Sequence, residues 1–267
     1  MKHQFLSDDN FAAKDTYSIV LPIDQGVEHG PKAAFLDTDH PKMLDVNYQI
    51  EYINNLLNEG LVSATALPYR VANLLVQKYP EQKDNVIVKM NHANNLNKDA
   101  TPMQARYGQS AIQFGGAGFT IYPGAPMQNQ MIEQFAEWRY RHIAPVYTKC
   151  ILWSYPRGGD FDPTSLETTM HAAYIAAQLE PTVIKVKLPA GNYNKAEDVE
   201  KIVKAACGIP VLFSGGAKTA RDNVLNDARD IAYGGGLGMI VGRNIFQRAP
   251  NEAKELLKDI HDIFANV

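Results

Sequence analysis

Short apolar runs alternate with amphipathic segments about eight times along the 267 residues of this chain. Each apolar run has the length and composition of a buried strand, and the intervening segments repeat their apolar residues with the period of a helix. Strands that alternate with helices form a parallel sheet with the helices packed outside it. Eight such pairs are typical of a closed barrel rather than an open sheet. We therefore predict an α/β fold in which residues 1–267 form a single (β/α)8 TIM barrel domain.

The boundaries of the predicted elements follow from the same pattern. The predicted strands cover residues 17–24, 63–67, 85–90, 118–122, 150–154, 183–187, 210–213 and 238–241. The predicted helices cover residues 47–59, 69–78, 102–114, 130–142, 164–178, 194–206, 219–230 and 251–260. Thr164-x-x-Glu167 and Asn194-x-x-Glu197 have the capping-box pattern, which predicts a helix start at each.

Composition restricts the classes of partner and compartment. With 45% hydrophobic residues and a net charge of −3, the chain resembles an ordinary globular protein and offers no broad basic surface for nucleic acid or membrane. The sequence has neither a secretory signal pattern nor an apolar run of membrane-spanning length, which predicts a cytoplasmic protein. Cys150 and Cys207 lack metal-ligand spacing, so both are predicted to be small buried apolar residues in a reducing compartment.

A barrel places catalytic groups at the C-terminal ends of its strands. Polar and aromatic residues do follow most of the predicted strands, so residues far apart in the sequence are expected to meet at one mouth. They are Asp24, Asn91, His92, Trp153, Tyr155, Lys185, Lys187, Ser214, Gly242 and Arg243.

Two lysines interrupt the apolar strand Val183-Ile184-Lys185-Val186-Lys187. Alternation along a strand turns Lys185 and Lys187 to one face, and Ile184 and Val186 to the other. Crowding and desolvation favour the neutral amine, which can attack a carbonyl and form a Schiff base. The alternatives are lysines paired with buried carboxylates and an edge strand with its lysines in water.

Other strand ends carry candidate partners for these lysines. Trp153 and Tyr155 share one face of the neighbouring strand, where a cation beside the phenol would lower its pKa enough for acid-base chemistry; an aromatic core pair is the alternative. Asp24 ends its strand and could hydrogen-bond a substrate hydroxyl and balance the lysine charge, or simply cap a turn.

Two glycine-rich loops follow the seventh and eighth predicted strands, Ser214-Gly215-Gly216 and Gly242-Arg243-Asn244. Barrels often bind phosphate in these two loops, with backbone N–H groups and a short extra helix as donors. Either cluster alone is equally typical of a plain turn. Gly234-Gly235-Gly236 precedes its strand, so we predict a turn at the opposite face.

Metal and cofactor signals are weak. His29 and His92 stand alone, without His-x-His or His-x-x-x-His spacing, and no dinucleotide or Walker fingerprint occurs. The aspartates Asp160 and Asp162 lie in a loop and are predicted to be solvated. We expect neither a metal nor a cofactor.

Taken in order, the motifs resemble those of the archaeal-type class I fructose-bisphosphate aldolases, and the resemblance covers nearly the whole chain. The motifs that carry it are Asp24-Gln25-Gly26-Val27-Glu28-His29-Gly30-Pro31, Thr120-Ile121-Tyr122-Pro123-Gly124, Trp153-Ser154-Tyr155-Pro156-Arg157-Gly158-Gly159, Ile184-Lys185-Val186-Lys187, Ser214-Gly215-Gly216-Ala217-Lys218-Thr219 and Val241-Gly242-Arg243-Asn244.

The resemblance implies that Lys185 forms the Schiff base and that Tyr155 transfers protons. It further implies active-site roles for Asp24, Trp153 and Arg157, and phosphate contacts from residues 214–216 and from Gly242 and Arg243. Lys187 is expected to bind substrate beside them. A homo-oligomer, in the form of a decamer of pentameric rings, is also implied. Two segments depart from the family pattern: Gln25 stands where some members have histidine, and Pro189-Ala190 replaces a more polar stretch.

The resulting hypothesis is reversible cleavage of fructose 1,6-bisphosphate to dihydroxyacetone phosphate and glyceraldehyde 3-phosphate. Another lysine aldolase, acting on a different phosphorylated ketose or making aminodideoxyheptulosonate, would share the lysine, the tyrosine and the phosphate loops. A sugar-phosphate isomerase would need a carboxylate or histidine base and no Schiff base. A non-catalytic sugar-phosphate binder would have little use for a neutral amine.

Overall fold

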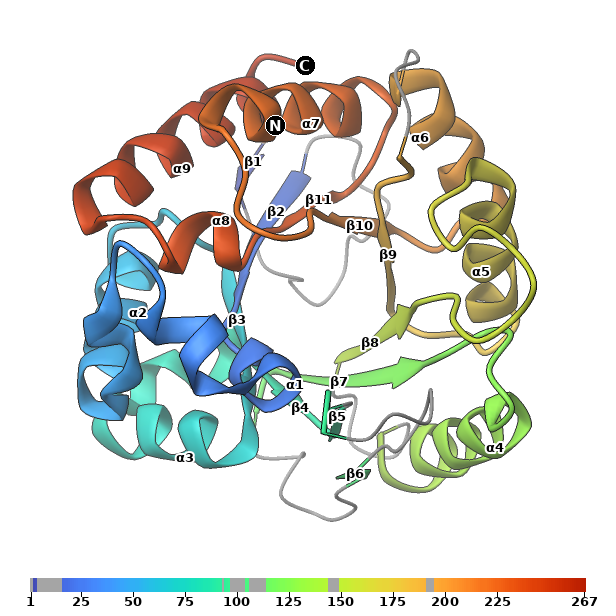
Figure 1. Cartoon of the computed structure of the whole chain (residues 1–267), viewed down its shortest axis with the longest axis horizontal. Helices are drawn as coiled ribbons and strands as arrows, with labels where there is room; N and C mark the ends of the chain where they lie inside the picture. The colour runs from blue at the N-terminus through green and yellow to red at the C-terminus, as the bar shows by residue number, and fades with distance from the viewer. Residues whose placement is uncertain are drawn as a thin grey trace.

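The computed structural model describes residues 2–3, 16–92, 94–96, 104–105, 114–143, 149–190 and 195–267. Within these ranges, eight parallel strands close into a ring surrounded by helices (Figure 1). The strands are neighbours in chain order, and the last one pairs with the first, Met239 lying opposite Ile19. The predicted (β/α)8 barrel is thus confirmed.

The barrel strands are β2 (Thr16–Pro22), β3 (Ala64–Pro68), β4 (Val86–Lys89), β7 (Gly116–Ile121), β8 (Lys149–Ser154), β9 (Val183–Lys187), β10 (Val211–Ser214) and β11 (Gly238–Ile240). The longer helices are α2 (Val46–Asn58), α3 (Tyr69–Lys78), α4 (Gln128–Trp138), α5 (Leu166–Ala177), α6 (Lys195–Ala205), α7 (Arg221–Tyr233) and α9 (Pro250–Ala265). The short elements are β1 (Lys2–His3), α1 (Gln25–Pro31), η1 (Lys32–Leu36), η2 (Pro41–Leu44), η3 (Pro80–Asn85), β5 (Asn91–His92), β6 (Gln104–Ala105), η5 (Arg139–Ile143) and α8 (Arg243–Phe246).

Two apolar layers stabilise the barrel. The outer layer joins the outward faces of the strands, such as Ile184 and Val186 of β9, to the buried stripes of the helices. The inner layer fills the barrel with Val20, Ala64, Ala66, Ile87, Ile151, Trp153, Val183, Leu212 and Ile240. Because both faces of each strand are covered, the strands are rich in apolar residues. Polar side chains on inward positions are therefore confined to the strand ends.

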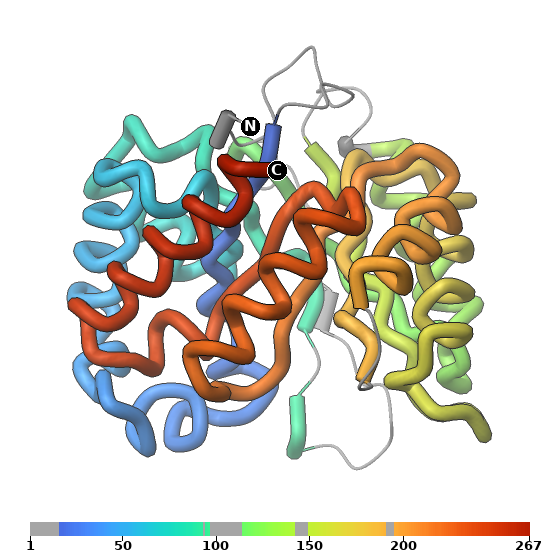
Figure 2. Tube along the Cα trace, turned by 90° about the horizontal axis from the view of Figure 1, so that it is seen from above, coloured from blue at the N-terminus to red at the C-terminus, as the bar shows by residue number. Residues whose placement is uncertain are grey.

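Different elements lie at the two ends of the barrel. Figure 2 shows α1 and η1 at one end, and the start of β2 and the end of α9 at the other. Strands run towards the α1 end, so this end is the C-terminal mouth. Gly234 ends α7 and precedes β11, as expected of a turn at the opposite face.

Several local predictions are wrong. Most of the predicted helix 102–114 lies outside the described residues, and of the three described residues within it, Gln104–Ala105 form β6 against β5 and Phe114 lies in a bend before β7. Ser165, not Thr164, caps α5, because its side chain accepts a hydrogen bond from the backbone N–H of Thr168 at 3.2 Å. Asn194 lies outside the described residues. Cys150 is buried as predicted, whereas Cys207 is exposed.

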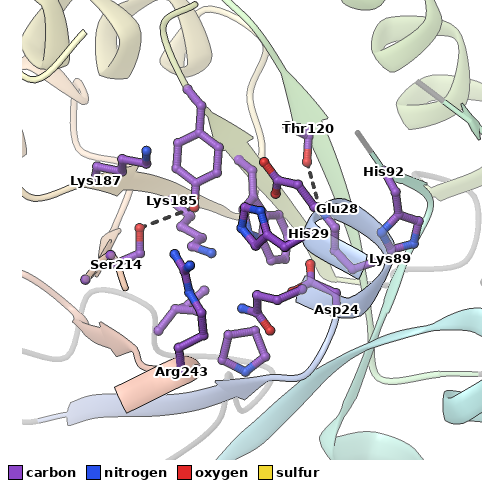
Figure 3. Close-up of a pocket in the computed structure, with 18 of the residues that line it drawn as sticks. Asp24, Glu28, His29, Lys89, His92, Thr120, Lys185, Lys187, Ser214 and Arg243 are labelled. Atoms are coloured by element: carbon purple, nitrogen blue, oxygen red, sulfur yellow. Dashed lines mark hydrogen bonds between the residues drawn. The ribbon is translucent and has the colours of Figure 1, made fainter. Parts of the chain in front are cut away.

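The first predicted strand ends too late. Residues 17–24 were predicted as a strand, but β2 ends at Pro22, and Gln25–Pro31 forms α1. The glycines at positions 26 and 30 and the proline at 31 predict a turn. The chain instead forms a short helix that is kinked at Gly30, whose φ is 81°. This helix carries Glu28 and His29 to the rim of the mouth (Figure 3).

Among the described residues, no helix combines the length and the apolarity needed to cross a membrane.

Candidate active site

A cavity of about 190 Å³ opens at the C-terminal mouth of the barrel. All eleven residues predicted for the site contribute to its wall, although they come from five different strands and the loops that follow them. They are Asp24, Trp153, Tyr155, Arg157, Lys185, Lys187, Ser214, Gly215, Gly216, Gly242 and Arg243.

Lys185 reaches into this cavity from β9, a central strand that pairs with β8 and β10. The residue is only 5% exposed. Burial, the largest cause, and the nearby Lys89 ammonium lower the pKa of Lys185 to about 7, while Asp24 acts in the opposite direction. The amine is therefore available as a neutral nucleophile near neutral pH. The edge-strand alternative is wrong.

Lys187 occupies the next inward position of β9 and is exposed at the rim. Its Nζ lies 5.6 Å from the centre of the Tyr155 ring. Burial and then the charges of Arg157 and Arg243 lower the pKa of Lys187, and Glu28 opposes them. Lys187 thus lies among cations, close to where a phosphate could sit.

Lys89, at the end of β4, is a second buried amine that the sequence analysis did not select. It is 4% exposed, and its Nζ donates a hydrogen bond to Thr120 Oγ1 at 2.7 Å. The same Nζ lies 3.8 Å from the centre of the Trp153 ring, and Lys185 Nζ lies 5.0 Å from it. Alternation from Ile87, which points inward, was the signal that could have identified Lys89.

Trp153 forms the floor between the two amines. Its ring lies against Gly118 of β7, where a Cβ would fall 2.2 Å from an indole carbon. The glycine therefore makes room for the indole inside the barrel. Its Nε1 is buried and has no hydrogen-bond partner among the described residues. Trp153 thus presents its aromatic face to the amines.

Tyr155 stands above Lys185, whose Nζ lies 5.4 Å from the centre of the phenol ring. The Tyr155 hydroxyl lies 3.2 Å from Ser214 Oγ (Figure 3). Ser214 Oγ in turn donates to the Val186 carbonyl. Since the serine proton is committed to Val186, the tyrosine donates to the serine. Burial raises the pKa of Tyr155 above its ordinary value. The predicted lowering of this pKa is therefore wrong for the free site, because burial and the charges of Asp24 and Glu28 outweigh the hydrogen bond with Ser214.

Two acidic residues face the amines, Asp24 from the segment between β2 and α1 and Glu28 from α1 itself. The Asp24 charge acts on both Lys185 and Lys89 and raises the pKa of each. Glu28 accepts a hydrogen bond from Arg157 Nη2 at 2.8 Å. Burial would raise the pKa of Glu28, but Arg157 outweighs it and the pKa falls. Glu28 therefore belongs to the site, although the sequence pattern alone did not predict a role for it.

The two glycine loops lie side by side at the opposite wall. Asn244 of α8 connects them, since its Oδ1 accepts from the Thr219 N–H at 2.9 Å and its Nδ2 donates to the Ala217 carbonyl at 3.4 Å. A Cβ on Gly242 would fall 2.9 Å from the Pro22 carbonyl, so a larger residue would displace the loop. Arg243 begins the short helix α8 and points towards Lys185 (Figure 3). Glycines, an arginine and a helix start form a suitable phosphate site.

His29 and His92 also line the cavity. Burial and the charge of Lys89 lower the pKa of His92 to about 4, so this ring is neutral. Asn95 Nδ2 lies 3.1 Å from His29 Nδ1. Among the described residues, no group of three histidine, cysteine or acidic side chains is placed to hold a metal ion.

Comparison with known proteins identifies related sequences and folds. Residues 18–248 match the model of the DeoC/LacD family aldolases. The chain is 31% identical over 236 residues to the class 1 fructose-bisphosphate aldolase of Thermoproteus tenax, covering 86% of this chain and 84% of the relative. It is 28% identical to the class 1 fructose-bisphosphate aldolase of Halobacterium salinarum, covering 90% of this chain and 88% of the relative.

Solved structures resemble the barrel closely. An archaeal fructose-1,6-bisphosphate aldolase, whose catalytic lysine is bound covalently to the carbinolamine intermediate of its substrate, superposes with a TM-score of 0.80 at 27% identity over 96% of both chains. Another archaeal fructose 1,6-bisphosphate aldolase gives a TM-score of 0.81 at 28% identity, again over 96% of both chains. The family model covers most of the barrel, from β2 to beyond α8. The chain therefore belongs to the DeoC/LacD aldolase family.

Proposed function

We propose that this protein is a Schiff-base (class I) fructose-bisphosphate aldolase that reversibly cleaves fructose 1,6-bisphosphate to dihydroxyacetone phosphate and glyceraldehyde 3-phosphate. The observation that carries the proposal is the buried Lys185, whose pKa is lowered to about 7, beside Tyr155 at a mouth lined by cations and glycine loops. The relatives described above are named as fructose-bisphosphate aldolases, which supports the same substrate here.

The proposed reaction begins with Lys185. Its neutral amine attacks the C2 ketone and forms a carbinolamine. Because its pKa is raised, Tyr155 enters the reaction as a protonated phenol and donates to the departing hydroxyl, which leaves as water. The products of this step are an iminium on Lys185 and a phenolate on Tyr155.

Cleavage then uses the same two residues. The iminium draws the electrons of the C3–C4 bond, and the phenolate of Tyr155 takes the proton of the 4-hydroxyl as that bond breaks. Glyceraldehyde 3-phosphate leaves, and Tyr155 returns its proton to the enamine carbon. Water then adds to the iminium and its proton returns to the Tyr155 phenolate, so that dihydroxyacetone phosphate leaves and both neutral Lys185 and protonated Tyr155 are restored. Asp24 offsets positive charge in the cavity throughout.

Substrate binding is assigned to the two walls of the mouth. The Ser214 to Gly216 loop, Gly242 and Arg243 would hold one phosphate, so that C2 meets the amine. Arg157 and Lys187, which approach from neighbouring strands, would bind the other end of the substrate. Trp153 shapes the floor beneath the reacting carbons.

Reduction of the intermediate tests the proposal directly. Borohydride added with fructose 1,6-bisphosphate should inactivate the protein and leave a reduced adduct on Lys185. Peptide mapping that finds no adduct would favour an isomerase or a binder, and an adduct confined to Lys187 would reassign the nucleophile. A coupled assay with fructose 1-phosphate and a heptulose bisphosphate beside the bisphosphate separates this activity from that of another lysine aldolase.

A cytoplasmic homo-oligomer, with a decamer as its form, is part of the same proposal. Exposed apolar side chains support an interface, such as Leu36 at 47% and Leu44 at 45% exposure on the adjacent elements η1 and η2. Light scattering during gel filtration should give a mass several times 29.6 kDa. A monomeric mass would contradict the assembly without affecting the proposed chemistry.

A further inference from the structure

The cavity holds two buried amines, Lys185 and Lys89, on one indole. Both lysines are at most 5% exposed, and they approach Trp153 from different strands, β9 and β4. Two ammonium groups this close and this buried would repel each other and lose much of their hydration. Of the two amines, therefore, one is expected to keep a proton near neutral pH while the other gives it up.

The surroundings of the two amines differ. Lys89 Nζ has a hydrogen-bond acceptor, Thr120 Oγ1, at 2.7 Å, and lies 3.8 Å from the centre of the Trp153 ring. Both interactions stabilise an ammonium, the second as a cation–π contact. In the part of the chain that the structure describes, the Lys185 amine has no hydrogen-bond acceptor, and it lies farther from the same ring, at 5.0 Å. The geometry favours the proton on Lys89.

The other charges in the cavity do not reverse this preference. Asp24 and Glu28 act on both amines in the same direction. Lys187 acts against a proton on Lys185, and Arg243, whose side chain points towards Lys185, is a further cation on that side. The His92 ring, beside Lys89, is neutral, and so is Tyr155, above Lys185. In agreement, burial lowers the pKa of Lys185 to about 7 and that of Lys89 only to about 8.

We propose that Lys89 is a positioning residue that keeps the cavity proton away from Lys185, so that Lys185 is held as the neutral nucleophile. The inference rests on the proposed Schiff-base function. The exchange moves one proton from the Lys185 ammonium to the Lys89 amine and leaves the total charge of the cavity unchanged. Thr120 and Trp153 supply the preference by binding the charged form of Lys89.

The pH dependence of iminium trapping tests this inference. Dihydroxyacetone phosphate and cyanoborohydride are added from pH 5 to pH 10, and the rate of adduct formation on Lys185 is followed by mass spectrometry. The parent profile should rise with a midpoint near 7. Lys89→Met removes the neighbouring charge, so its midpoint should move up by roughly 0.5 to 1 pH unit. Lys89→Arg keeps the charge and should hold the midpoint at or below that of the parent.

Lys187→Met is the matched control, because it removes an equal charge that lacks the Thr120 and Trp153 contacts. Its midpoint should move less than that of Lys89→Met. An unchanged or lower midpoint in Lys89→Met, or an equal shift in Lys187→Met, would overturn the inference. Failure of the parent to form any adduct on Lys185 would instead overturn the proposed function.

A measurement on the parent alone tests the inference even if a variant does not fold. Trace acetylation across the same pH range, read by peptide mapping, reports which amine is neutral first. Lys185 should become reactive at lower pH than Lys89. The opposite order of reactivity would contradict the assignment of the proton to Lys89.

Discussion

At the scale of single residues, the site depends on what burial does to two titratable groups. Burial among other cations lowers the pKa of Lys185 to about 7, and burial raises the pKa of Tyr155 further above neutral pH. An amine that can act as a nucleophile and a phenol that can act as an acid are thus both present before substrate arrives. Each of these states has a consequence that can be measured.

Tyr155→Phe should separate carbonyl capture from carbon–carbon cleavage. The ring remains above Lys185, but the hydroxyl that is proposed to act as acid and then as base is lost. Turnover should fall by roughly a hundred- to ten-thousandfold, the usual range for a general acid–base residue. Borohydride should still trap an adduct on Lys185 during long incubation, since water can protonate the departing hydroxyl. Cleavage at near-parent rates would assign the proton transfer to another group, with Asp24 next in line.

Lys185→Met should stabilise the protein at neutral pH. The folded pKa of about 7 lies below the ordinary value of 10.5, so between these values the unfolded chain binds a proton that the folded chain does not. The free energy of unfolding therefore rises with pH across this window, and the cost of burying Lys185 is largest at its lower end. At pH 7 the variant should melt several degrees above the parent, and the difference should shrink towards pH 10.

Lys187→Met is the control for the melting measurement, because Lys187 is exposed. Because the pKa of Lys187 is also lowered, the melting temperature of this variant should move in the same direction as that of Lys185→Met, but by less. If the advantage of Lys185→Met were constant with pH, ordinary apolar packing rather than the buried amine would explain it.

At the scale of secondary structure, strand ends and the loops after them decide what the cavity contains. β7 illustrates the constraint from within the barrel. Its residues Gly116 and Gly118 point inward, where Ile87, Ile151 and Trp153 occupy the space that side chains would take. The absence of side chains at these two inward positions thus allows a tryptophan on the next strand.

Gly118→Ala should destabilise the barrel and move Trp153. The new Cβ would fall 2.2 Å from the indole ring, and overpacking of this kind costs about 1–3 kcal/mol. Urea unfolding should show the loss, and tryptophan fluorescence should change in the folded state. Gly216→Ala is the matched control for stability, because its Cβ would meet no atom within 4 Å. Equal stability of Gly118→Ala and the parent would mean that the indole is not confined as described.

Arg243→Ala tests the phosphate site at α8. Losing one charge-assisted hydrogen bond costs roughly 1.5–3 kcal/mol, so KM for fructose 1,6-bisphosphate should rise about ten- to hundredfold while kcat changes less. Arg229→Ala is the control. Arg229 lies on the exposed face of α7 and does not line the cavity, so the variant loses the same charge but should keep the KM of the parent. A parent-like KM in Arg243→Ala would assign phosphate binding to other groups.

The sequence predicts the elements better than it predicts the details at their ends. All eight strands were identifiable, because each carries a compact apolar run, and residues 183–187 match β9 at both boundaries. α1 was missed because its glycines and proline favour a turn, and only tertiary packing beside the mouth overrides that preference. Lys89 was missed because a single lysine ending an apolar run is read as a strand terminus. Its role depends on Thr120 and Trp153, which lie on other strands.

At the scale of the whole molecule, the local charge of the mouth opposes the charge of the chain. The net charge is −3, yet Arg157, Lys187 and Arg243 line one cavity and outnumber its two carboxylates even before Lys89 is counted. Converging strand ends gather these cations from positions that are distant in the sequence. A low-dielectric wall strengthens their attraction for a bisphosphate, so the mouth should concentrate an anionic substrate despite the acidic chain.

Salt should therefore weaken binding in proportion to the charge of the substrate. The Debye length falls from about 10 Å at 0.1 M salt to about 3 Å at 1 M, which screens the rim cations more than the buried amines. KM for fructose 1,6-bisphosphate should rise severalfold over this range, and KM for fructose 1-phosphate, with one phosphate fewer, should rise less. The rate of adduct formation at saturating substrate should change little, because Lys185 and Lys89 are screened from solvent by burial. Equal salt dependence for the two substrates would mean that the second phosphate lies in water, away from Arg157 and Lys187, and that only the loops of β10 and β11 hold the ketose.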